Sequence, residues 1–370
     1  MSVETIPSAP TAIGRRAPPL TEATLRNIEG VLLPVLAVLA GLAIFGAFIA
    51  AVGKSPADLY GYVWRGGFGT AFSLQNTMQR TAPLLLTALC VALPAQLGLV
   101  MIGGEGAFVL GGLGAAWAGA HLAGMGAFGS VLMAIAGALV GALWIGIAGA
   151  LRHWRGVNET ISSLLLAYLG IALFNHLVEG PLRDPGSLNK PSTPPIDASL
   201  KIGSMFGLNV HWGFLIGCVA CLLAAFVVGR TTFGFAARIA GGNARAAAVQ
   251  GLPVGKLILA FAAAGGAAAG LAGAIDVAAV QGSANASIVA GYGYAGILIA
   301  FLARQNPLAI IPMAILIGGI QASGGLVQRR MQLPDATVQV LQGILFVCIL
   351  ASETLNGRLL PRRWLERSPR

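Results

Sequence analysis

The chain has 370 residues, of which 56% are hydrophobic and 10% are charged, whereas a soluble domain carries roughly 25% charged residues. This composition excludes an ordinary soluble enzyme and predicts an all-α, polytopic membrane protein, because about 20 apolar residues suffice for one membrane-spanning helix. The 52 glycines are typical of helices that pack closely within a bilayer. The net charge of +10 fits contact with anionic membrane lipid, and no basic stripe with interleaved aromatic residues indicates nucleic-acid binding.

In chain order, a polar N-terminal tail at 1–30 precedes a membrane domain at 31–353, and a basic tail follows at 354–370. Two polar segments interrupt the domain: a loop at 179–209, where five prolines exclude a continuous helix, and a loop at 230–256. The apolar runs predict about ten transmembrane helices, at 31–52, 82–101, 106–123, 128–151 and 157–178, a sixth that ends at Gly229, and others at 257–280, 288–303, 307–325 and 335–353.

The distribution of basic residues predicts the orientation of these helices. With the N-terminus inside and ten spans, 15 of the 23 Lys and Arg residues fall on the cytoplasmic side. Six of the eight outer ones lie in two long segments, 53–81 and 179–209, which weigh less in the positive-inside rule. We therefore expect both termini and the 230–256 loop to be cytoplasmic, and the 179–209 loop to lie outside.

Polar side chains at membrane depth are candidates for function because they are costly there. Glu105 lies among glycines in a sequence that favours a broken helix, which is tolerated where it lines a cavity or is buried in protein. Asn158 and Glu159 begin a span, so helix capping is an alternative to a role in transport. Asp276 lies near the outer end of its span, compatible with either a polar pathway or contact with outside water. We interpret these four residues as candidates for a translocation pathway.

The 230–256 loop contains a short helix signal. Asn243 is a suitable N-cap, good helix formers follow up to Gln250, and Gly251-Leu-Pro253 is a stop signal. This helix is too short to span a membrane, and a capped helix on the cytoplasmic side is suited to dock into the groove of a partner. The candidate docking residues are Arg238, Asn243, Arg245, Ala246, Ala247 and Gly251.

Each candidate enzyme motif in the sequence lacks a required residue or the required structural context. Gly53-Lys54-Ser55 resembles the end of a phosphate-binding loop, but Phe48 stands where the first glycine is required. A G-x-G-x-x-G pattern at 291–296 opens an apolar membrane run and follows no strand, so packing is the better interpretation. The four histidines have no metal-ligand or triad spacing. We predict no catalytic residue, no metal site and no cofactor.

Four stretches together resemble a known family. The 230–256 loop is similar to the ATPase-contacting loop of bacterial ABC-importer permeases of the ribose, simple-sugar and nucleoside branch. Gly98-Leu-Val-Met-Ile-Gly-Gly-Glu-Gly106 resembles a family motif in which Met101 replaces Asn and Ala107, which follows it, replaces a common Gln. Nucleoside-type members are similar in three places: Asn158-Glu-Thr-Ile161 through Tyr168, Glu179-Gly-Pro-Leu-Arg-Asp-Pro185, and Gly291-Tyr-Gly-Tyr-Ala-Gly-Ile297 continuing through Leu302-Ala-Arg-Gln-Asn-Pro307.

The resemblance implies a multi-pass inner-membrane permease that imports a nucleoside or simple sugar and is not itself an enzyme. It implies three partners: an ABC ATPase subunit that binds the ATP, a second permease chain, and an extracytoplasmic solute-binding protein. An ion-coupled secondary transporter is the alternative, in which buried carboxylates would couple to protons or sodium. An intramembrane enzyme is a further alternative, but no pair of nucleophile and base supports it.

Overall fold

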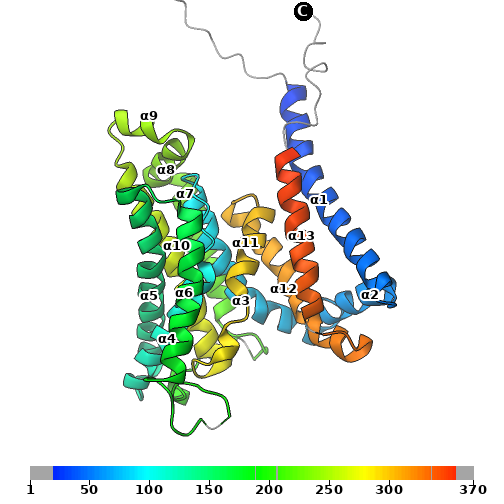
Figure 1. Ribbon diagram of the computed structural model, residues 1–370, viewed down its shortest axis with the longest axis vertical. Coiled ribbons are helices and arrows are strands. Elements are labelled where there is room, and N and C mark those ends of the chain that lie inside the picture. The colour runs from blue at the N-terminus through cyan, green and yellow to red at the C-terminus, as the bar shows by residue number, and fades with distance from the viewer. Residues whose placement is uncertain (1–19, 188, 206, 335, 356–370) are drawn as a thin grey trace, which may run out of the picture.

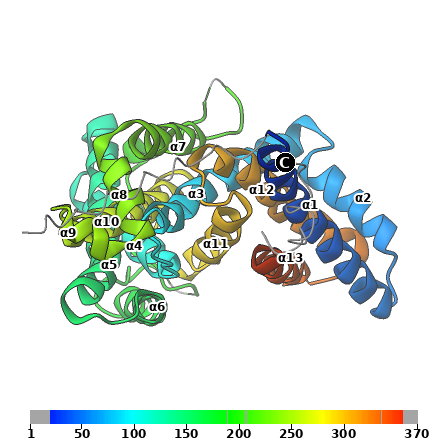
Figure 2. The ribbon, with the colours of Figure 1, turned by 90° about the horizontal axis from the view of Figure 1, so that it is seen from above.

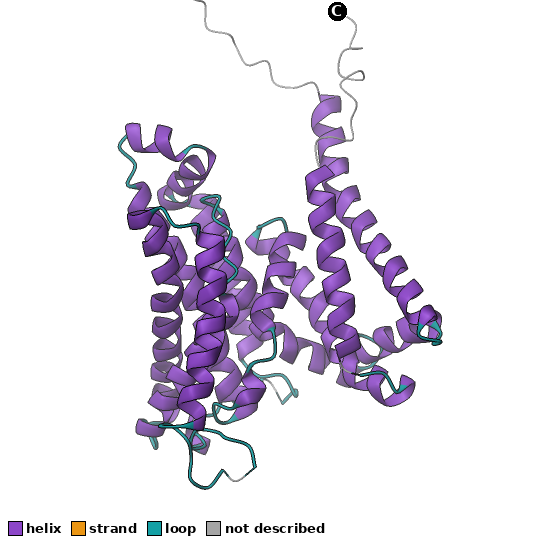
Figure 3. Cartoon of the chain, in the orientation of Figure 1, coloured by secondary structure: helices purple, strands orange, loops and turns teal. Residues whose placement is uncertain are grey.

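The computed structural model describes residues 20–187, 189–205, 207–334 and 336–355, and within these ranges the chain is almost entirely helical with loops between helices (Figures 1 and 3). The helices are α1 (Leu20–Ala51), α2 (Pro56–Gly67), α3 (Ala71–Ala95), α4 (Gly104–His121), α5 (Gly126–Arg155), α6 (Glu159–Glu179), α7 (Gly213–Arg230), α8 (Thr232–Gly242), α9 (Ala244–Val249), α10 (Val254–Asp276), α11 (Tyr292–Leu302), α12 (Pro307–Met331) and α13 (Ala336–Leu355). Short helical turns are η1 (Ala198–Leu200), η2 (Val277–Gln281), which is a π-helix, and η3 (Ala286–Ile288).

Each apolar run of the sequence overlaps a helix, but not every helix has the length and hydropathy of a membrane span. Seven helices in the described chain do: α1, α3, α5, α6, α7, α10 with η2, and α12. The segments Ala286–Leu302 and Ala336–Ser352 are apolar but shorter. The two expected tails lie largely outside the described residues, and the chain is helical where the description reaches them, at 20–30 and 354–355.

The helices form two groups (Figure 1). In one group α4, α5 and α10 pack on one another, α6 packs on α4 and α5, and α4 and α10 also contact α3; the other group contains α1, α2, α12 and α13. Seen from above, α11 lies between the groups (Figure 2), in contact with α3, α4, α12 and α13. The start of α1 and the end of α13 lie at the same end of the molecule as α8 and α9, opposite the 179–209 loop (Figure 1).

Glycine faces bring α4, α5 and α10 together. A Cβ added at Gly270 would lie 2.1 Å from the carbonyl oxygen of Gly137, and one at Gly141 would lie 2.2 Å from that of Gly266. A Cβ at Gly111 would lie 2.3 Å from the Cα of Gly270. Such close backbone contact replaces the hydrophobic driving force that is missing between helices in lipid, so larger side chains on these faces would separate the three helices.

The 179–209 loop is fixed across the segment that follows α10. Thr193 donates its backbone N–H to Ala284 over 2.9 Å and accepts one from Ala284 at its Oγ1, also over 2.9 Å. Ile196 donates to Gly282 over 2.9 Å, and the buried side chain of Leu200 lies against the start of α5. As expected, the described residues of 179–209 form no continuous helix, only the short turn η1, and backbone hydrogen bonds to another loop satisfy several of their polar groups.

Candidate functional site

The segment between α7 and α10 folds into two short helices, α8 and α9, at one end of the molecule (Figure 1). Asn243 separates them, and its Oδ1 accepts the backbone N–H of Ala246 over 3.0 Å, which confirms the predicted N-cap. α9 ends at Val249, and Gly251 then adopts a φ of +84°, which confirms the predicted stop. The local sequence signals thus account for the position of α9.

α9 presents most of its surface outward. Val249 is 89% exposed, whereas Ala247 is fully buried and fixes the helix to the bundle. Five of the six predicted docking residues are exposed, namely Arg238, Asn243, Arg245, Ala246 and Gly251. The arrangement is a supported helix with a free outer face that carries positive charge, which suits it to contact another protein.

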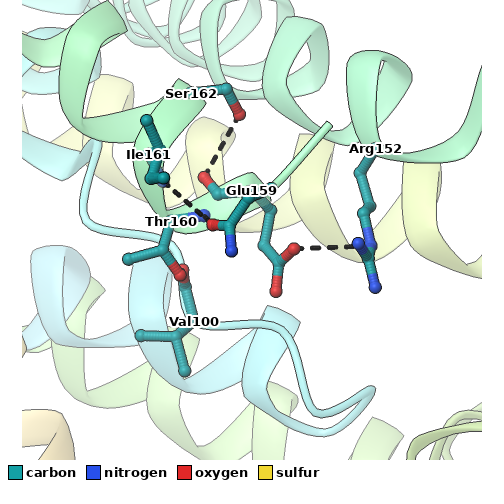
Figure 4. Close-up of polar contacts among 7 residues, drawn as sticks. Val100, Arg152, Glu159, Thr160, Ile161 and Ser162 are labelled. Carbon is teal, nitrogen blue, oxygen red and sulfur yellow. Dashed lines mark hydrogen bonds and ion pairs between the residues drawn. The ribbon is translucent and has the colours of Figure 1, made fainter. Parts of the chain in front are cut away.

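The start of α6 is held by a local cap and an ion pair (Figure 4). The Oδ1 of Asn158 accepts backbone N–H groups from Thr160 over 2.9 Å and from Ile161 over 3.1 Å. Glu159 lies 3.4 Å from the guanidinium of Arg152 at the end of α5. Both predicted candidates therefore take part in fixing the α5–α6 turn, which is the capping alternative of the sequence analysis.

Glu105 is fully buried in the first turn of α4, and its side chain caps a different helix, α11. Its two carboxylate oxygens accept the backbone N–H groups of Gly291 over 2.8 Å and Gly293 over 2.6 Å, at the start of α11. A Cβ on Gly293 would lie 2.2 Å from the backbone nitrogen of Glu105, so only glycine permits this approach. A negative group at a helix N-terminus satisfies free N–H groups and complements the helix dipole. Gly293 therefore has the packing role that the sequence indicates, whereas Gly291 meets no atom within 4 Å and instead adopts a positive φ of +79°.

Asp276 is the last residue of α10, immediately before the π-helix η2. Its side chain is 4% exposed and its Oδ2 makes no hydrogen bond with any described residue. Tyr292, the first residue of α11, is half-buried, and its ring lies 5.5 Å from that of Phe108 in α4. Of the four predicted pathway residues, Glu105 thus contacts the start of α11, Asp276 ends α10, and Asn158 and Glu159 lie at the start of α6.

Comparison with known proteins assigns the chain to a family. Residues 73–350 match the family described as the permease component of branched-chain amino acid transport systems. The chain belongs to this permease family. The permease is similar to the glucose ABC transporter permease protein TsgB13 of Haloferax volcanii, with 31% identity over 86% of this chain and 87% of the relative.

Two further relatives of the permease are named for nucleosides. The guanosine ABC transporter permease protein NupP of Bacillus subtilis is 27% identical over 90% of this chain and 96% of its own length. The nucleoside ABC transporter permease protein NupB of Lactococcus lactis is 25% identical over 79% of this chain and 83% of its own length. These relatives confirm the resemblance inferred from the sequence motifs, and the permease is a membrane-embedded subunit of an ABC transporter.

Two features of the permease were not predicted from the sequence: the helix α8 and the contacts of Gln96. α8 has a local signal, because Thr231 precedes it and its Oγ1 accepts the backbone N–H of Gly234 over 3.2 Å as an N-cap. Gln96 has none: its side chain donates to the carbonyl oxygens of Ala92 and Gln305, the second of which is 209 residues away. Only the folded chain shows that second contact.

Proposed function

We propose that this permease forms the translocation pathway of an ABC importer in the bacterial inner membrane, with ten transmembrane helices and both termini in the cytoplasm. The excess of Lys and Arg on one side of the ten-span topology supports this orientation. The start of α1 and the end of α13 lie at the same end as α8 and α9 (Figure 1), which agrees with an even number of crossings. α4 is not among the seven helices with the length and hydropathy of a span, but its mostly buried surface faces other helices.

The α8–α9 segment carries the proposal. Its exposed residues Arg238, Asn243 and Arg245 form an outward face, and the buried Ala247 makes the segment move with the bundle. We assign this face to a separate ABC ATPase subunit, which binds and hydrolyses the ATP, so that the permease needs no cofactor of its own. ATP-driven closure of two ATPase subunits would displace the docked helices and alternate the access of the pathway between two states.

The relatives' names support a nucleoside or a simple sugar as the solute. The pathway runs between this chain and a second permease chain, near the segments that hold Glu105, Asn158, Glu159 and Asp276. An extracytoplasmic solute-binding protein delivers the solute to the side of the 179–209 loop. Hydroxyl, amide and aromatic groups suffice to pass an uncharged solute, and the pathway needs only weak contacts because affinity resides in the binding protein.

Co-purification from native membranes tests the proposal. The wild-type chain is expected to retain an ATPase and a second permease, and reconstituted vesicles that contain the whole complex are expected to take up guanosine or glucose only when ATP is supplied. The Asn243→Ala, Arg245→Ala double variant is expected to lose the ATPase while keeping the second permease, because the cap and one exposed cation of the docking face are removed.

The opposite outcome is equally defined. If the chain purifies without an ATPase and transports solute under a proton or sodium gradient, it is a secondary transporter. The buried carboxylates Glu105 and Asp276 would then become the candidates for ion coupling.

A further inference from the structure

The non-helical residues between α3 and α4, together with the first residues of α4, form a largely buried connection that we name the hub segment, residues 96–105. Leu97 and Leu99 are 8% and 5% exposed, and Met101 and Glu105 are fully buried. A connection between two long helices ordinarily runs over the surface. Most of this one is buried or half-buried, although Gly98 is exposed, so its backbone can contact several helices at once.

The hub segment contacts the α8–α9 segment directly. A Cβ added at Gly241, near the end of α8, would lie 2.5 Å from the carbonyl oxygen of Gln96 and 3.1 Å from the Cα of Leu97. Leu97, Leu99 and Met101 also share one hydrophobic cluster with the buried faces of α8 and α9, which contribute Ala237, Ala240 and Ala247. Closely packed side chains transmit displacement rather than absorb it, so a movement of α8 and α9 pushes on the hub segment.

The same segment holds α11 at both ends. At the far end, the Nε2 of Gln96 donates to the carbonyl oxygen of Gln305 over 3.1 Å, in the turn between α11 and α12. At the near end, Glu105 accepts the N–H groups of Gly291 and Gly293. α11 has 11 residues, and a rise of about 1.5 Å per residue makes it about 16 Å long. A helix this short, held at both ends, moves as one body.

The α11–α12 turn stays in an unfavourable conformation. Arg304 and Gln305 have φ values of +51° and +59°, and each is a residue with a side chain in the left-handed region. Such conformations are unfavourable for residues with a side chain and persist only where the surroundings impose them. The Gln96 hydrogen bond to the carbonyl of Gln305 is one such constraint, and releasing it would let the turn relax.

We propose that the hub segment is the joint through which the α8–α9 segment moves α11, with Gln96 and Glu105 as positioning residues. The inference rests on the proposed function, because it supplies the path by which an ATPase docked at α8–α9 acts on the pathway. α11 lies between the two helix groups (Figure 2), so its displacement changes the contact between them. The start of α6 is also connected to the hub segment, since the hydroxyl of Thr160 donates to the carbonyl of Val100 over 2.8 Å (Figure 4).

The test measures the number of solute molecules transported per ATP hydrolysed, in vesicles that contain the complete transporter. Gln96→Met keeps the length of the side chain and removes both donated hydrogen bonds. We expect the ratio to fall about threefold to tenfold, the equivalent of losing the one hydrogen bond to the α11–α12 turn, while ATP hydrolysis continues. Gln328→Met makes the same change at an exposed position of α12 and is expected to leave the ratio unchanged.

A second pair of variants perturbs the other face of the joint. Gly241→Ala places a methyl group against the backbone of Gln96, whereas Gly242→Ala, one residue further, meets no atom within 4 Å. Gly241→Ala is expected to lower the transport ratio, and Gly242→Ala is expected to leave it at the wild-type value. A purely structural role for Gly241 would reduce the yield of assembled transporter without changing the ratio per assembled complex.

The outcomes separate this inference from the proposed function. If the wild-type complex shows no ATP-dependent transport, the proposed function fails, and the joint fails with it. If wild type is coupled and both Gln96→Met and Gly241→Ala keep the wild-type ratio, the joint alone is refuted. If either variant hydrolyses ATP with reduced transport while its control does not, the joint is supported.

Discussion

Two short helices of this permease begin in opposite ways. α9 begins at a cap from its own sequence, because Asn243 accepts the N–H of a residue three positions later. α11 begins at a cap from a distant helix, because Glu105 accepts N–H groups 186 and 188 residues away. The first cap depends on a few neighbouring residues, whereas the second exists only when α4 and α11 are packed together. The comparison shows which helix forms independently and which is positioned by the fold.

The two caps also differ in their surroundings. Asn243 is exposed, so water can replace its hydrogen bond when it is removed. Glu105 is fully buried, where water does not reach the freed N–H groups and electrostatic attraction is stronger. We therefore expect very different consequences from removing each cap.

Glu105→Ala is expected to have the largest effect. It leaves the N–H groups of the buried Gly293 and the partly buried Gly291 without their acceptor, and each unsatisfied group costs up to about 1–3 kcal/mol. The free energy of unfolding should fall by about 2–6 kcal/mol on this basis. The measurement is the thermal unfolding midpoint of the purified permease in detergent.

Glu105→Gln is the matched control. The amide keeps one oxygen acceptor at nearly the same position and should retain roughly half of the stabilisation. If Glu105→Ala unfolds at the wild-type temperature, the carboxylate does not cap α11, and the contrast between the two helices disappears.

Asn243→Ala is expected to have a smaller, local effect. Loss of an N-cap costs about 1 kcal/mol, which is enough to fray a helix of six residues without unfolding the bundle. Hydrogen exchange of 244–249 should become faster while the thermal unfolding midpoint stays within experimental error. Asn243→Ser supplies a hydroxyl oxygen that can cap in place of the amide oxygen and should restore slow exchange. Fast exchange in both variants would show that the cap is not what orders α9.

The sequence predicts the features that depend on neighbouring residues. The apolar runs, the caps at Asn158 and Asn243, and the stop at Gly251 each rely on residues within a few positions, and the structure agrees with them. The broken helix around Glu105 is also predictable from its flanking glycines, but its acceptance of the α11 N–H groups is not, because no local pattern specifies a partner 186 residues away. The contact of Gln96 with Gln305 cannot be predicted from the sequence for the same reason.

The start of α7 combines features of both cases. His211 lies two residues before Gly213, the first residue of α7, and its Nδ1 accepts the Gly213 N–H over 3.2 Å. The cap is local, as at α9, but the imidazole is buried, as Glu105 is. Burial lowers the pKa of His211 below its usual value, with a smaller opposing contribution from the backbone carbonyl of Gln79.

This third cap predicts a dependence of stability on pH, the smallest of the three effects because it vanishes at neutral pH. Below pH about 6.5 the unfolded chain binds a proton at this histidine, whereas the folded chain resists it, so the free energy of unfolding falls with falling pH until the folded-state pKa is reached. Unfolding midpoints of wild type and His211→Gln, taken from pH 7.5 to 5, should differ in slope, with the variant less sensitive to acid. His176→Gln, at an exposed position of α6, should keep the wild-type slope. Equal slopes for wild type and His211→Gln would mean that the folded chain binds this proton as readily as the unfolded chain, so that burial does not lower the pKa of His211.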